Sequence, residues 1–293
     1  MIINISELGA ICGKMSFEPK TKMLLLYWAK YDKQGCKKFL IENNIIEVAE
    51  FPSNTFTRLN RILQEELNQI VITENTKNIE RLTDIATNSY KKQDTEASEY
   101  KISLFRELYK QKISQKLGSV SEKTVVLKQH AHRPKISIEY QLTPEITLKG
   151  VCDCMLDDDT IIEVKTRTKI ENVRKNEYDL CQLFGYILGY NATKGKIVQR
   201  FQDQYFSSDE ETATEYGIVD INEPKWNKKL KSTIKAIKLF NNEVYNLVHN
   251  GTTSWNIIED TFQQGELPIC TINNNNKVIN KNNKYNKLIS FLF

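Results

Sequence analysis

Two acidic residues and a lysine stand close together in the middle of the chain. Asp153 comes shortly after Gly150, and the run over 161–165 (IIEVK) then carries Glu163 and Lys165. Alternate side chains of a strand share a face, so we expect Glu163 and Lys165 to point the same way. A hairpin would bring Asp153 beside them. Two carboxylates next to an amine suit a hard divalent cation such as Mg²⁺ and the hydrolysis of a phosphate ester.

This spacing of Asp, Glu and Lys also has a plain structural reading. All three residue types are common, and charged residues on a strand often lie on a solvated face. The context favours chemistry, because Ile162 and Val164 fill the other face of the strand while the acid and the base share one. Three aspartates over 157–159 supply the turn that would return the chain to Asp153.

The surrounding residues alternate in a way that predicts strands joined by turns. We expect strands over 135–142, 146–152, 160–165, 196–201 and 217–221. A helix is expected over 177–190, ended by Asn191. Strands mixed with helices in chain order predict an α/β (α+β) fold, with a central mixed β-sheet flanked by helices.

Helical periodicity dominates the chain before this region. We expect a short helix that Ser6 caps and Gly13 ends, a second near 23–31, and two or three more over 55–117 with a polar break near 93–99. The first 117 residues are therefore predicted to form a mainly helical subregion that packs on a core over 118–221.

The C-terminal part, over 222–293, is expected to belong to the same domain. Pro224 is predicted to begin a long helix whose first half carries six lysines, a pattern that fits either a solvated face or contacts with phosphates. The Asn/Lys-rich segment over 273–287 is expected to be a loop or flexible tail.

Composition excludes several classes of protein. The 41 Lys and Arg against 37 Asp and Glu leave a net charge of +4, which is at most a mild preference for polyanions. The six cysteines include no CxxC pair, which argues against a zinc ribbon, an iron–sulfur cluster or a disulfide framework. No apolar run reaches the ~18 residues of a membrane span. We expect a soluble intracellular protein that does not bind membranes.

Together with a later run from Gln182 to Tyr186, Asp153 and the pair Glu163 and Lys165 resemble the PD-(D/E)XK nuclease superfamily. The resemblance is closest to the RecB-like and YqaJ-like branch, which includes exonucleases of lambda-type phages and large DNA viruses. In that branch a helix with a Gln-x-x-x-Tyr motif follows the acidic motif, and here Gln182 and Tyr186 share one helix face. The resemblance implies a restriction-endonuclease-like core.

The resemblance also implies a metal site. Mg²⁺, with Mn²⁺ as a substitute, is expected to be held by Asp153, Glu163, the Val164 carbonyl and a glutamate from a preceding helix. Glu122 has the matching position, with Glu107 as the second choice. Read structurally, Glu122 is a solvated residue in a segment where Ser119 or Ser121 caps a helix.

The remaining motif residues have expected roles around that metal. Lys165 is expected to stabilise developing charge or to position the nucleophile, and Gln182 to orient the nucleotide or Lys165. Tyr186 is expected to support the same face, although a helical aromatic residue is also a common core residue. His130 and His132 are interpreted as surface histidines, and the thiols on either side of Asp153 as core residues.

Basic residues near the motif are the expected DNA contacts. Four directly follow the motif strand: Arg167, Lys169, Arg174 and Lys175. The residues over 5–13 and 19–22 resemble the YqaJ-like opening, where an arginine helps to receive the 5′ phosphate of a DNA end. No arginine precedes Arg58 here, so the candidates are Lys14, Lys20 and Lys22, and a strict 5′-phosphate requirement is not implied.

The resemblance thus implies a Mg²⁺-dependent DNA exonuclease that hydrolyses phosphodiester bonds at linear duplex ends in recombination, replication or repair. A structure-specific or single-strand endonuclease of the same fold and an inactive nucleic-acid-binding protein are the alternatives. DNA is the expected partner. Homo-oligomerisation, and association with a single-strand annealing or recombination protein, stay open.

Overall fold

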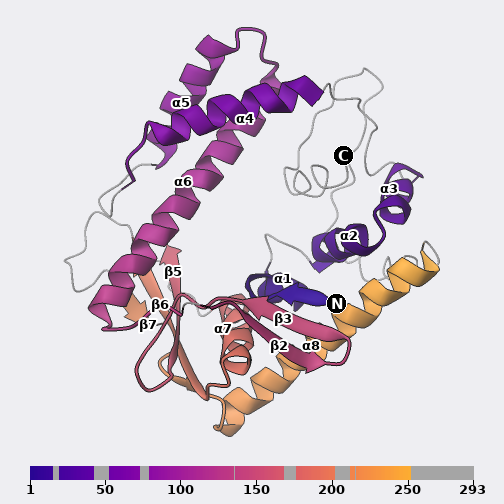
Figure 1. The fold of residues 1–293 in the computed structure, drawn as a ribbon, viewed down its shortest axis with the longest axis vertical. Helices are drawn as coiled ribbons and strands as arrows, with labels where there is room; N and C mark the ends of the chain where they lie inside the picture. Colours follow the sequence, from indigo (N-terminus) through magenta and orange to yellow (C-terminus); the bar gives the residue numbers. More distant parts are fainter. Residues whose placement is uncertain are drawn as a thin grey trace.

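The computed structural model describes residues 1–15, 20–42, 53–72, 79–134, 136–167, 176–201, 212–214 and 216–251. Helices and strands follow one another as predicted for the α+β class, with two mixed sheets at one end and a group of helices at the other (Figure 1). The predicted tail over 273–287 lies outside the described residues.

The first sheet joins the beginning of the chain to its middle. It has the order β1-β3-β2, made from β1 (Ile2–Asn4), β2 (Ile138–Thr143) and β3 (Ile146–Gly150). β1 runs parallel to β3, and β2 runs antiparallel to it. The sequence did not predict β1, because its pairing partner lies more than a hundred residues later in the chain.

The second sheet carries the acidic motif. Its strands are β4 (Cys154–Met155), β5 (Ile161–Arg167), β6 (Lys194–Phe201), β7 (Thr212–Thr214) and β8 (Val219–Asp220). β5 and β6 are parallel, and the other pairs are antiparallel. The strands therefore divide between two sheets rather than forming one central sheet, and Asp153 lies where the chain crosses from β3 to β4.

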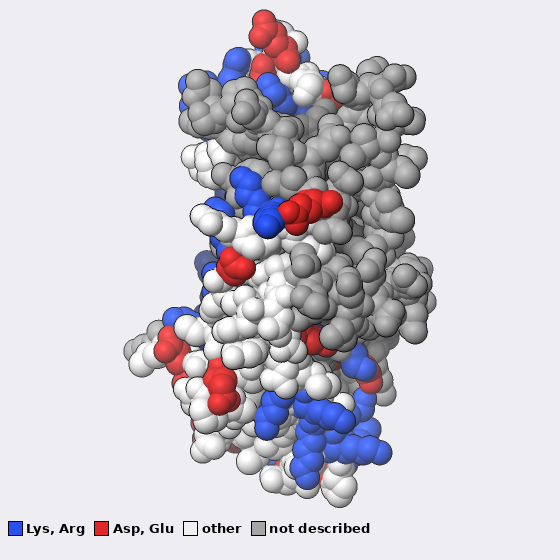
Figure 2. All heavy atoms as spheres, turned by 90° about the vertical axis from the view of Figure 1, so that its right-hand side faces the viewer, with Lys and Arg blue, Asp and Glu red and all other residues white. Residues whose placement is uncertain are grey.

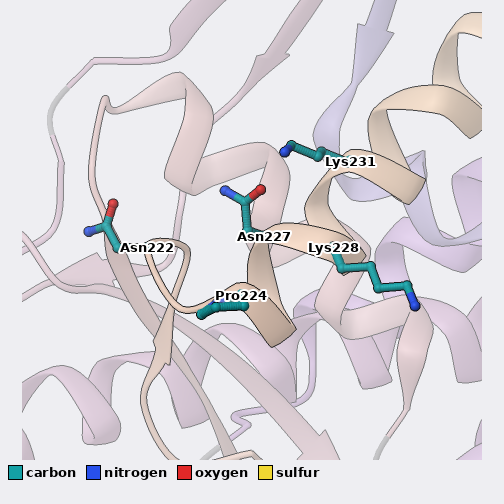
Figure 3. Close-up of a pocket in the computed structure, with 5 residues that line it drawn as sticks. All are labelled: Asn222, Pro224, Asn227, Lys228 and Lys231. Atoms are coloured by element: carbon teal, nitrogen blue, oxygen red, sulfur yellow. The ribbon is translucent and has the colours of Figure 1, made fainter.

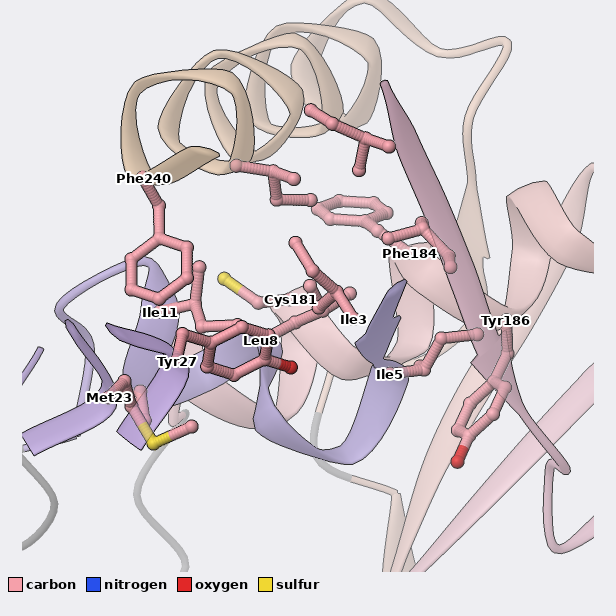
Figure 4. Packing of buried hydrophobic residues seen from close by; sticks show 14 of the residues in the cluster. Ile3, Ile5, Leu8, Ile11, Met23, Tyr27, Cys181, Phe184, Tyr186 and Phe240 are labelled. Carbon is pink, nitrogen blue, oxygen red and sulfur yellow. The ribbon is translucent and has the colours of Figure 1, made fainter. Parts of the chain in front are cut away.

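Helix α7 (Glu177–Gly189) connects the two sheets and contacts strands of both. Its buried residues, Leu183, Phe184 and Ile187 among them, join Ile161 and Ile197 in the main hydrophobic core. The turn η1 (Ile5–Glu7) and helix α1 (Leu8–Ile11) pack against the same helix (Figure 4). Ser6 lies inside η1, so the predicted Ser6 cap is wrong, while Gly13 ends the segment with a φ of 67°.

Three further helices close the other side of the core. They are α2 (Lys20–Tyr31), α3 (Lys33–Glu42) and α8 (Pro224–Asn250), of which α3 was not predicted. Pro224 occupies the first turn of α8, as expected from its fixed φ. Tyr27 meets Phe240 edge to face, with 5.3 Å between ring centroids, which joins α2 to α8.

A separate helical arm extends from the second sheet (Figure 1). It consists of α4 (Ser53–Asn68), α5 (Ile79–Gln93) and α6 (Glu99–Lys128), with the predicted break between the last two. The arm has an apolar cluster of its own, in which the rings of Tyr90 and Phe105 stack with 4.4 Å between their centroids. The 30 residues of α6 span about 45 Å and run through residue 118, so Ser119 and Ser121 cap nothing.

No helix in the described ranges is both long and apolar enough to cross a lipid bilayer.

Candidate active site

Strand β5 is covered on both of its faces. Ile162 and Val164 pack with Val125 of α6 in a small apolar cluster. The opposite face, which carries Glu163 and Lys165, lies under α7. Glu163 is only 2% exposed. The acid and the base therefore share a face as predicted, but that face is enclosed, so their charges interact through little water.

The amine of Lys165 lies among three polar side chains. It donates to Glu163 Oε1 at 2.8 Å and to Gln182 Oε1 at 2.6 Å. Asp179 Oδ1 lies 3.6 Å from the same nitrogen. Burial alone lowers the pKa of Lys165, but the neighbouring carboxylates outweigh it and the net direction is upward. Lys165 is therefore a fixed positive charge.

Asp153 is oriented by the backbone of β5. Its Oδ2 accepts a 2.7 Å hydrogen bond from the Val164 amide. Because β4 is only two residues long, the side chain of Asp153 takes the place of a backbone partner at this point of the edge. The amide and carbonyl of one strand residue point toward the same edge, which puts the Val164 carbonyl on the Asp153 side.

One carboxylate oxygen of Glu163, Oε2, is buried and makes no hydrogen bond within the described residues. Burial, together with the charges of Asp153 and Asp179, raises the pKa of Glu163 to about 8, although Lys165 opposes the shift. A buried acceptor without a donor is costly, and a cation would satisfy it. The oxygen ligands that Asp153, Glu163 and the Val164 carbonyl offer therefore fit Mg²⁺.

The predicted fourth ligand, Glu122, lies near this set but is held by another residue. Arg133 donates to its Oε2 at 3.1 Å, and the Glu122 side chain is 29% exposed. Burial, and secondarily the charge of Asp153, raise its pKa. In the described part of the chain, no three acidic, histidine or cysteine side chains form a ready metal cluster. The fallback Glu107 lies about 22 Å away along α6 and cannot join the set.

Three polar residues of α7 face β5 at helical spacing. They are Asp179, Gln182 and Tyr186. Burial, and then the charge of Glu163, raise the pKa of Tyr186. A side chain at Gly150 would approach the Tyr186 ring to 3.0 Å, which shows how closely the ring packs there. Tyr186 thus belongs to both the core and the wall of the site.

Asp179 is the site residue that sequence reasoning missed. It is fully buried and lies beside the Lys165 amine, three residues before Gln182. Its spacing from Gln182 could have revealed it, because a residue one helical turn before Gln182 lies on the same helix face as Gln182. Without the register of α7 on β5, the same residue is an ordinary acidic residue in the first turn of a helix.

The basic residues expected to contact DNA do not form one cluster within the described residues. Lys14 pairs with Glu177 at 2.8 Å and Lys20 with Glu243 at 2.6 Å, so both make internal ion pairs. Lys22 is partly buried on α2. Arg167 ends β5, and the others lie outside the described residues: Lys169, Arg174 and Lys175.

The histidines and thiols near the motif have structural places. His130 and His132 are exposed on the segment that follows α6, and His132 pairs by its backbone with Met155. Cys152 and Cys154 are buried thiols on either side of Asp153, as expected.

Comparisons with known proteins add little to this geometry. Neither a family model nor a curated protein matches the sequence. The chain is similar to the crystal structure of an alkaline exonuclease from Laribacter hongkongensis, with 9% identity, a TM-score of 0.35, and coverage of 52% of this chain and 73% of that one. It is also similar to the crystal structure of SSO0001, with 18% identity, a TM-score of 0.33, and coverage of 65% and 87%. Any function assigned to the chain must therefore rest on the contacts of Lys165, Glu163 and Asp153.

Proposed function

We propose that the protein is a metal-dependent nuclease of the PD-(D/E)XK type that hydrolyses phosphodiester bonds in DNA. The observation that carries the proposal is the arrangement around β5. The Lys165 amine is held between Glu163 and Gln182, next to a buried Glu163 oxygen that lacks a donor among the described residues. Asp153 adds a second carboxylate at the same point of the strand.

Mg²⁺, or Mn²⁺ in its place, would be held by Asp153, Glu163 and the Val164 carbonyl, with Glu122 as a further ligand. When bound, the metal supplies a more acidic water and neutralises charge on the phosphate.

The side chains divide the remaining work. Lys165 provides a fixed positive charge for the developing negative charge on the phosphate. Gln182 keeps the amine in place through its 2.6 Å hydrogen bond, and Asp179 supports the amine electrostatically. The Val164 amide holds Asp153 in one orientation, so the carboxylate need not reorganise when substrate binds.

The finer proposal is exonuclease action on linear duplex ends in recombination, replication or repair. Its support is the order of motifs along the chain: Asp153, then Glu163 and Lys165, then Gln182 and Tyr186. All five residues gather around one strand and one helix.

A pair of substrates tests the proposal. Linear duplex DNA, labelled at the 5′ or the 3′ end, and a covalently closed circle are incubated with Mg²⁺, Mn²⁺ or EDTA. We expect digestion of the linear form alone, with either metal but not with EDTA. Asp153→Asn and Lys165→Ala should abolish it. Matched controls are Asp157→Asn, whose side chain is 99% exposed, and Lys149→Ala, a surface ion-pair lysine on β3.

Each other outcome has a definite meaning. Cutting of the circle indicates an endonuclease. DNA binding without cleavage of any substrate indicates an inactive nucleic-acid-binding protein. Undiminished cleavage by both site variants would refute the site.

A further inference from the structure

Helix α8 carries a stripe of exposed lysines outside the proposed active site. We define the lysine stripe as Lys225, Lys228, Lys231, Lys235 and Lys238. They recur every three or four residues and therefore share one side of the helix. The opposite side is buried in the core: Trp226, Leu230, Thr233, Ile237 and Phe240. Figure 2 shows basic side chains gathered at the lower end of this face of the molecule, where α8 lies.

Within the described part of the chain the lysine stripe has no ion-pair partner, whereas some basic residues elsewhere on the helices do. Arg106 and Lys110 of α6 share Glu80 of α5, and Lys229 of α8 pairs with Glu177. Within the described ranges no member of the stripe forms an ion pair. The first acidic residue within α8 is Glu243, which binds Lys20. Like charges at this spacing destabilise a helix, so the stripe has a cost that a binding role would explain.

An open depression of about 500 Å³ lies where α8 begins. Its lining combines two lysines of the stripe with two asparagines and a proline: Asn222, Pro224, Asn227, Lys228 and Lys231. In Figure 3 the amine of Lys231 extends toward Asn227, and Lys228 extends the other way along the surface. The depression thus offers amide and ammonium groups beside a straight row of further positive charges.

The shape of the row favours duplex DNA as its ligand. Its 14 residues span about 20 Å, over which a duplex presents a charge about every 1.7 Å along its axis. A lipid surface fits less well, because the apolar side of α8 is buried in the protein and cannot insert. We propose that the lysine stripe of α8 binds the phosphate backbone of duplex DNA that flanks the cleaved bond.

This inference rests on the proposed function, and the connection between the two sites is structural. Lys229 of α8 pairs with Glu177 in the first turn of α7, whose Gln182 holds Lys165. Cys181 of α7 touches Thr233 on the buried side of α8, with 3.7 Å between their polar atoms. The stripe points away from α7. A duplex must therefore extend beyond the catalytic site to reach it, and only longer duplexes should use both.

Fluorescence anisotropy with labelled duplexes tests the stripe. The triple variant Lys231→Gln, Lys235→Gln and Lys238→Gln is compared with a control that removes the same charge from the arm, namely Lys91→Gln, Lys92→Gln and Lys112→Gln. Both are made in an Asp153→Asn background, and circular dichroism checks the helix content. Duplexes of about 12 and about 40 base pairs are titrated over a range of salt concentrations.

We expect the stripe variant to weaken binding of the longer duplex about tenfold and to leave the shorter one unchanged. The slope of log K against log salt should fall by about 2 to 3, close to 0.9 for each phosphate that the variant no longer neutralises. The arm variant should match the parent. Equal losses of affinity in both variants, or no loss in either, would overturn the proposal.

Two further measurements separate this inference from other readings. Loss of binding to phosphatidylserine vesicles, with DNA binding intact, would assign the stripe to a membrane surface and refute it. If the protein with Asp153 intact shows no cleavage but the stripe variant still loses DNA binding, the proposed function fails while the DNA surface stands.

Discussion

Gln182 of α7 accepts a 2.6 Å hydrogen bond from the Lys165 amine on β5. The charged amine is therefore positioned by a helix as well as by its own strand. Asp179, one turn earlier on α7, lies 3.6 Å from the same nitrogen. The packing of α7 against β5 thus sets both the place and the charge state of Lys165.

Asp179→Asn should weaken the hold of α7 on the Lys165 amine without changing the shape of the site. With one negative charge fewer beside it, the Lys165 amine is held less firmly and its pKa falls toward the ordinary value. We expect kcat to fall about tenfold and the free energy of unfolding by about 1 to 3 kcal/mol, less than for a fully broken pair because Glu163 remains. Asp84→Asn, at a surface ion pair, is the control. An unchanged kcat together with a lowered free energy of unfolding would leave Asp179 with a structural role only.

Glu163→Gln should change how stability depends on pH. The pKa of Glu163 is about 8 when folded and about 4.3 when unfolded, so the folded state binds more protons between these values. The free energy of unfolding of the metal-free protein should therefore fall as pH rises from about 4.5 to 8. The Gln variant should gain in relative Tm across this window and level off above it. If the Tm of the Gln variant and of the parent, both in EDTA, changed with pH in parallel, the raised pKa of a buried Glu163 carboxyl would be contradicted.

Glu122→Gln and Arg133→Gln should affect Mg²⁺ affinity in opposite directions. If Glu122 is a ligand, its loss should weaken binding about tenfold. Arg133 competes for Glu122 and places a positive charge near Asp153, so its loss should tighten binding about fivefold. Calorimetric titration with Mg²⁺ measures both changes. An unchanged Mg²⁺ affinity in Glu122→Gln would remove Glu122 from the ligand set.

Two glycine variants test the packing of α7. At Gly185 a Cβ would lie 2.6 Å from Leu8 Cδ1 and 2.8 Å from Ile5 Cγ2. Gly185→Ala should lower the free energy of unfolding by about 1 to 3 kcal/mol and reduce cleavage, because α7 must move away from its neighbours.

Gly118 provides the matched control, since it lies in a helix where an added Cβ would meet no atom within 4 Å. Gly118→Ala should raise stability by about 0.5 to 1 kcal/mol and leave cleavage unchanged. Urea denaturation measures both variants. A destabilised Gly118→Ala would show that α6 is not continuous at this point.

Local patterns were sufficient to predict the elements of the candidate site. The alternation of Ile162 and Val164 with Glu163 and Lys165 predicted the two faces of β5. The i, i+4 spacing of Gln182 and Tyr186 predicted one face of α7. Period and spacing are properties of a single segment, which is why a sequence reveals them.

Contacts between distant segments could not be read in this way. The role of Asp179 depends on the register of α7 over β5, and the burial of Glu163 depends on the same helix. The ion pairs of Lys14 and Lys20 join residues more than 150 positions apart. The local sequence does not distinguish a lysine that pairs with a carboxylate of the same chain from one that is free to bind a phosphate.

The parallel pairing of β1 with β3 constrains the order of folding. Residues 2–4 pair with residues 147–149, so β1 has no partner until those later residues have been synthesised. Closing so long a loop is slow, because its entropy is lost before the contacts form. The apolar residues over 2–11 must therefore wait exposed on the growing chain.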